Sequence, residues 1–130
     1  MKLLLDTEVL YVMLTQSSMV LDHHREQIQE VAANGGLRIS VASLLQLREA
    51  KQEGLIGATH LDAIDDWMKS HTPQIVPIDV RVLASMSRTW DNESVADRLL
   101  LATARCEDLR LATFREFSYP QVEYFLVKRQ

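Results

Sequence analysis

Two aspartates in the sequence occupy positions where carboxylates could hold a metal ion. Asp6 directly follows an apolar run at residues 2–5, and Asp97 lies one turn into an apolar helical pattern. Carboxylate oxygens are the ligands that hard divalent cations prefer. Acidic side chains also cap helices and favour their first turns. Position alone therefore leaves metal binding and helix capping open for both aspartates.

Other polar residues offer weaker candidates. Asp79 follows a strand pattern, where a phosphoacceptor aspartate could lie, but helix capping explains the residue equally well. Ser43 and Gln46 have the S-x-x-Q spacing of a capping box. Glu49 lies one turn beyond Gln46 on a similar helix face, where a solvent-exposed acid is expected.

The elements that must position these residues alternate between strand and helix patterns. Strands are expected at residues 2–5, 37–41, 74–78, 109–113 and, as an edge strand, 122–126. Helices are expected at residues 9–14, 21–33, 43–54, 59–68, 79–90 and 95–106, the last four capped by Ser43, Thr59, Asp79 and Ser94. This alternation predicts a parallel sheet with helices on both faces, and a functional crevice beyond the carboxyl ends of its strands.

Composition limits the class of protein. The chain has 130 residues, 14 Lys+Arg against 18 Asp+Glu, and a net charge of −4. This length predicts a single domain over residues 1–130. No apolar run is long enough for a membrane helix, and Cys106 is the only cysteine, so we expect a cytoplasmic protein. The net acidity argues against nucleic-acid binding by bulk positive charge, but it allows a nuclease with acids gathered at one metal site.

Four segments together resemble the motifs of PIN domains, specifically the VapC-toxin branch. Residues 3–10 (LLLDTEVL) are similar to its L-L-D-T-H opening, and residues 39–46 (ISVASLLQ) to its I-S-A-A-S-L-W-E segment. Residues 96–104 (ADRLLLATA) match its D-P-x-D-R-L-L-I-A-T-A segment, and residues 111–115 (LATFR) stand where the branch has L-x-T-x-D. The segments occur in the family's order and span nearly the whole chain.

The resemblance implies a three-layer α/β/α fold with a central, mainly parallel sheet of four to five strands. It also implies a site that binds Mg²⁺ or Mn²⁺ and cleaves RNA, with Asp6 and Asp97 as catalytic metal ligands and Thr7 and Thr113 in support. Clustered carboxylates can hold such an ion, which activates water and offsets phosphate charge. RNA, a small antitoxin protein and a second copy of the chain are the partners implied.

Several positions depart from the family pattern. Gln46 stands where the branch has Glu, Ser94 replaces the first acid of D-P-x-D, and Arg115 replaces the Asp of the last segment. The histidine after D-T is Glu8. These changes remove acids that a metal would need, so two functions remain open: a metal-dependent endoribonuclease, and a degenerate PIN domain that binds RNA or protein without hydrolysis.

Nearby charged residues could compensate for the lost acids. Glu8, Glu49, Glu93 and Glu116 could supply carboxylates, although none occupies a family position. Arg115 could instead offset the lost cation by pairing with Asp6 or Asp97. The location of the Arg115 side chain therefore distinguishes the two functions.

Overall fold

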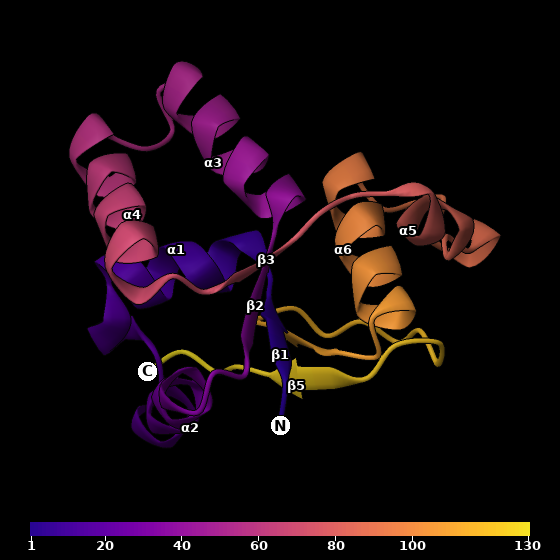
Figure 1. The fold of residues 1–130 in the computed structure, drawn as a ribbon, viewed down its shortest axis with the longest axis horizontal. Helices are drawn as coiled ribbons and strands as arrows, with labels where there is room; N and C mark the ends of the chain where they lie inside the picture. The colour runs from indigo at the N-terminus through magenta and orange to yellow at the C-terminus, as the bar shows by residue number, and fades with distance from the viewer.

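A five-stranded sheet, parallel throughout, forms the centre of the computed structural model, which describes residues 1–130 (Figure 1). Its strands are β1 (Leu3–Leu5), β2 (Leu37–Ser40), β3 (Gln74–Val76), β4 (Arg110–Thr113) and β5 (Tyr124–Leu126). They lie in the order β3-β2-β1-β4-β5, and all four neighbouring pairs are parallel. The first strand of the chain is therefore the middle strand of the sheet.

Helices cover both faces of this sheet (Figure 1). On one side lie α1 (Thr7–Thr15), α2 (Asp22–Ala33) and α4 (Ala58–His71), and on the other α5 (Val80–Ala84) and α6 (Val95–Cys106). Helix α3 (Val41–Gln52) packs against α1, α4 and α6, and short 3-10 turns occupy Ser17–Met19 and Arg88–Trp90. None of the helices is both long and apolar enough to cross a membrane. The predicted three-layer α/β/α architecture is confirmed.

Alternation along β1 divides the apolar interior into two cores. Leu3 and Leu5 face the core beneath α1, α2 and α4, whereas Leu4 faces the core that contains Trp90 and Leu101. All of these side chains are essentially inaccessible to solvent. A strand buried on both faces carries apolar residues without polar alternation, which explains the uninterrupted leucine run.

Polar side chains begin the helices at the carboxyl end of the sheet. Asp6 caps α1 by accepting a hydrogen bond from the Val9 amide (2.7 Å). Ser94 caps α6 through the Asp97 amide (3.1 Å), and Asp79 caps α5 through the Val82 amide (3.1 Å). The capping predicted for Ser94 and Asp79 is confirmed, and Asp6 has the capping role that the sequence left open beside metal binding.

Two other predicted caps are wrong. Helix α3 is capped by Ser40, whose hydroxyl accepts from the Ala42 amide (3.0 Å), while Ser43 is buried inside the helix. Helix α4 begins after Gly57 rather than at Thr59. A capping residue needs an extended backbone, and Ser40 meets this requirement because it also ends β2.

The predicted helix at residues 79–90 is also too long. Helix α5 ends at Ala84, and Trp90 lies in a separate 3-10 turn. The indole of Trp90 is nevertheless fully buried, in the core that also contains Leu4 and Leu101. The predicted strand at 122–126 is shorter than expected, but β5 is an edge strand, as predicted.

Candidate acidic site

A pocket of about 360 Å³ lies beside the residues at the carboxyl ends of β1 and β4 and the start of α6. It brings together many of the polar residues that the sequence singled out. Its lining consists of Asp6, Thr7, Glu8, Tyr11, Gln46, Leu47, Ala50, Ile56, Asp97, Arg115 and Phe117. We refer to this pocket as the acidic site.

The carboxylate of Asp6 lies at the base of the acidic site, and its pKa is raised to about 6. Burial is the largest cause, because it disfavours the charged form. Hydrogen bonds from Thr113 and the Val9 amide lower the pKa, whereas the neighbouring charges of Glu8 and Asp97 raise it. Asp6 therefore combines a capping role with a destabilised negative charge.

Arg115 joins two acids beside Asp6. Its Nη1 donates to Asp97 Oδ2 (3.1 Å), and its Nη2 donates to Glu93 Oε2 (2.6 Å) and also to Glu93 Oε1. The Glu93 side chain is only 6% exposed, whereas that of Arg115 is 52% exposed. The guanidinium also stacks over the Phe117 ring (4.3 Å), and the bond to Glu93 raises the pKa of Arg115 further.

Arg115 thus pairs with Asp97, one of the two partners that the sequence offered for it. Its other partner, Glu93, is the residue of this cluster to which sequence reasoning gave least weight. The available signal was the position of Glu93 immediately before the cap of an apolar helix. Burial of its side chain could not be inferred from that position.

Thr7 links α1 to α3 at the side of the acidic site. Its hydroxyl lies 3.1 Å from the Ser43 hydroxyl and donates to the side-chain carbonyl of Gln46. Gln46 therefore holds two helices together at a position where the resembled family has an acid. A neutral amide engaged in this bond adds no negative charge to the site.

Glu8 and Tyr11 of α1 also line the acidic site. Glu8 forms an ion pair with Arg129, whose guanidinium stacks over Phe114 (4.0 Å). The Tyr11 hydroxyl lies 2.6 Å from His60 Nδ1. Sequence reasoning missed Tyr11, although its spacing of four residues from Thr7 places both on one helix face.

The remaining candidates lie outside this pocket. Glu49 and Glu116 are exposed, Ser94 is engaged as a cap, and Thr113 is fully buried at the end of β4. Asp79 caps α5 and pairs with Arg81, and it does not line the acidic site.

The side chains present do not fit a divalent metal ion in this arrangement. No group of three or more histidine, cysteine, aspartate or glutamate side chains is placed to hold one. Mg²⁺ and Mn²⁺ prefer several carboxylate or other oxygen ligands, whereas here Asp97 and Glu93 are bound to Arg115. The carboxylates that an ion would require as ligands are thus already paired with the Arg115 guanidinium.

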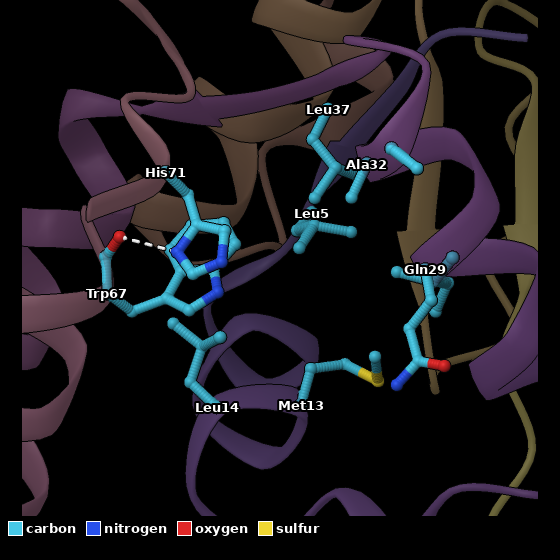
Figure 2. Close-up of a pocket in the computed structure, with 10 residues that line it drawn as sticks. Leu5, Met13, Leu14, Gln29, Ala32, Leu37, Trp67 and His71 are labelled. Carbon is cyan, nitrogen blue, oxygen red and sulfur yellow. Dashed lines mark hydrogen bonds between the residues drawn. The ribbon is translucent and has the colours of Figure 1, made fainter. Parts of the chain in front are cut away.

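A second pocket, of about 380 Å³, is apolar and lies between α1, α2 and α4 (Figure 2). Met13 and Leu14 of α1 face Trp67 and His71 of α4 across it, with Leu5 behind them. The His71 ring stacks on the Trp67 indole, with 4.7 Å between centroids. Its lining has no carboxylate or strongly basic side chain, so this pocket offers no acidic ligand to a metal ion.

Comparison with known proteins gives a likeness of fold. No family model matches the chain, and no curated protein matches it. A chain of the VapBC2 complex from Rickettsia felis, solved with a promoter DNA fragment, superposes with a TM-score of 0.76 at 16% identity, covering 96% of this chain and 98% of that one. A chain of the DNA-bound VapBC complex from Salmonella typhimurium gives 0.74 at 17% identity, covering 96% and 97%.

These superpositions span nearly the whole of each chain. The chain therefore has the PIN-like α/β/α fold that its sequence motifs predicted. At such low identity the likeness defines the fold alone, and the function has to be argued from the side chains.

Proposed function

We propose that this chain is a PIN domain of the VapC branch that works as the toxin-like component of a toxin-antitoxin pair, binding a small antitoxin protein without hydrolysing RNA. Two independent lines support the branch. Four sequence segments follow its motifs in order, and the fold superposes on chains of two VapBC complexes.

The observation that carries the non-hydrolytic part of the proposal is the position of Arg115. Its guanidinium binds Glu93 and Asp97, and the acidic site contains no metal-binding group of three side chains. Metal-assisted hydrolysis requires an ion held firmly enough to activate water. An acidic site whose carboxylates are already paired with a side chain attracts that ion less strongly.

Exposed apolar side chains support a role in protein binding. Val41 and Leu45 on α3 are 41% and 57% exposed and border a groove of about 640 Å³ between α3 and α4. The far side of this groove carries Met68, with Arg48 and Asp65 paired at its edge. Apolar surface with charged residues around it is typical of protein contacts.

RNA cleavage assays test the proposal directly. Purified protein is incubated with structured and unstructured RNAs in Mg²⁺ or Mn²⁺, beside the Asp6→Asn variant as a matched control. We expect no difference between the two proteins. Cleavage by the native protein that disappears in Asp6→Asn would contradict the proposal. Equal traces of cleavage in both would identify contamination.

A binding experiment tests the remaining part. The chain is coexpressed with a candidate small antitoxin protein, and the purified product is examined by light scattering. We expect a complex of defined stoichiometry that also reports whether the chain forms a homodimer. Purification of the chain alone, with no association at micromolar concentration, would contradict the antitoxin partner.

The second candidate is a Mg²⁺- or Mn²⁺-dependent endoribonuclease. It is favoured by one observation: Asp6 and Asp97 line the same pocket, close enough for the charge of Asp97 to raise the pKa of Asp6. Cleavage that depends on both added metal and Asp6 would establish this function in place of the first.

A further inference from the structure

We propose that Arg115 is an internal substitute for a divalent cation: its guanidinium offsets part of the negative charge of the acidic site and competes with any metal ion for the carboxylates of Glu93 and Asp97. The proposal concerns the site discussed above, but its readout is metal binding rather than RNA cleavage. The two proposals can therefore fail separately.

The hydrogen-bond geometry supports this role. One guanidinium bridges two carboxylates through different nitrogens, Nη1 to Asp97 and Nη2 to both oxygens of Glu93. Charge-assisted bonds to carboxylates from the planar guanidinium are among the strongest hydrogen bonds in proteins. The Arg115 backbone is fixed as well, because its amide donates to the buried Thr113 hydroxyl (3.1 Å).

Burial makes the pairing necessary. Glu93 is buried, with 9% of the whole residue exposed to solvent. Arg115 supplies the only side-chain hydrogen bonds that Glu93 accepts. A buried carboxylate without a partner is strongly unfavourable. A cation beside Glu93 offsets this cost, and Arg115 is the one that the chain provides.

Removal of Arg115 would leave a different site. Glu93 and Asp97 would then face the space that the guanidinium vacates with two unpaired carboxylates. Such a set has the charge and the oxygen ligands that Mn²⁺ prefers. Because the Arg115 side chain is half exposed, its truncation opens this space to solvent without cutting into the apolar core.

Mn²⁺ binding by electron paramagnetic resonance tests the competition, because free aqueous Mn²⁺ gives a signal that falls on binding. We expect Arg115→Ala to bind Mn²⁺ at least about tenfold more tightly than the native protein, since charge-assisted hydrogen bonds no longer have to be broken. Arg110→Ala is the matched control, because it breaks an exposed ion pair to Glu123 (3.4 Å) at the start of β4, and Arg110 does not line the acidic site. Its affinity should equal that of the native protein.

Thermal unfolding provides a second readout. Arg115→Ala should have a lower Tm than the native protein without metal, and Mn²⁺ should raise that Tm. Adding Glu93→Gln to Arg115→Ala should restore stability without metal, because the unpaired charge is gone, and should weaken the Mn²⁺ effect. If Arg115→Ala alone does not fold, we expect the double variant to fold, and failure of the double variant to fold would contradict a charge-neutralising role for Arg115.

Two results would overturn the proposal. One is native protein that binds Mn²⁺ as tightly as Arg115→Ala. The other is a folded Arg115→Ala protein that gains neither Mn²⁺ affinity nor Mn²⁺-dependent stability. Either result would mean that Arg115 does not take the place of a cation.

Discussion

The raised pKa of Asp6 predicts that Asp6→Asn stabilises the protein at neutral and alkaline pH. The pKa of Asp6 is 3.8 in the unfolded reference and about 6 in the folded protein. Above pH 6 the folded state must carry a charge that its surroundings disfavour. A rise from 3.8 to about 6 corresponds to about 3 kcal/mol of lost stability once the group is fully ionised.

The sign of the pH dependence follows from the direction of this shift. Below pH 3.8 the carboxyl is protonated in both states and contributes nothing. Between pH 3.8 and about 6 the unfolded state loses its proton first, so stability falls as pH rises. Asparagine keeps the cap of α1, because its side-chain oxygen can also accept from Val9. We therefore expect Asp6→Asn to gain about 1–3 kcal/mol at pH 8, and this gain to shrink towards pH 4.

Urea unfolding followed by circular dichroism at several pH values between 4 and 8 measures this gain. Asp79→Asn is the matched control, because Asp79 also caps a helix but its pKa is lowered, chiefly by the hydrogen bond from the Val82 amide. The same substitution should therefore destabilise the protein at pH 8, with a difference that fades on acidification. An Asp6→Asn variant that is less stable than the native protein at pH 8, or a gain that does not change with pH, would refute the reasoning.

Three further substitutions test the packing, each by the free energy of urea unfolding. Gly36→Ala should lower the free energy of unfolding by at least about 1 kcal/mol, because the added Cβ would lie 2.5 Å from the Met1 carbonyl oxygen and 2.8 Å from a Val31 methyl. An unchanged urea midpoint would contradict this steric conflict. Ser40→Ala should cost about 1–2 kcal/mol through loss of a fully buried cap, and a neutral result would contradict the assigned start of α3. Leu101→Ala should cost about 2–5 kcal/mol, because its side chain is fully buried in the core beside α6, and a loss under 1 kcal/mol would contradict that burial.

The sequence was most informative where local and long-range requirements agree. Helix α6 was predicted at its observed bounds, because Ser94 is a good cap and the apolar residues that follow match a buried helix face. The start of α3 could not be predicted in the same way. Ser40 and Ser43 are both capable caps, and the choice between them depends on where β2 ends, which is set by its pairing with β1 and β3.

The acidic site was also predictable in part. The rule for the carboxyl ends of parallel strands pointed to Asp6, whereas Asp97 was paired with it only through the resemblance to PIN domains; both residues line the acidic site. The bridge from Arg115 to Glu93 could not be foreseen, since it joins two loop residues whose side-chain directions depend on the whole fold. Which residues carry function remains a prediction.

The order of strands in the sheet also has a consequence for biosynthesis. Leu3 in β1 pairs with Leu37 on one side and with Arg110 on the other, so the middle strand acquires its second neighbour only after most of the chain has been translated. Until then the apolar edge and the Leu4 face of β1 have no native cover from β4 or α6. Contacts so distant in sequence slow folding and prolong exposure to aggregation. We therefore expect nascent chains that stop before β4 to be bound by chaperones or to aggregate. This expectation depends on the strand order and not on the side chains of the acidic site.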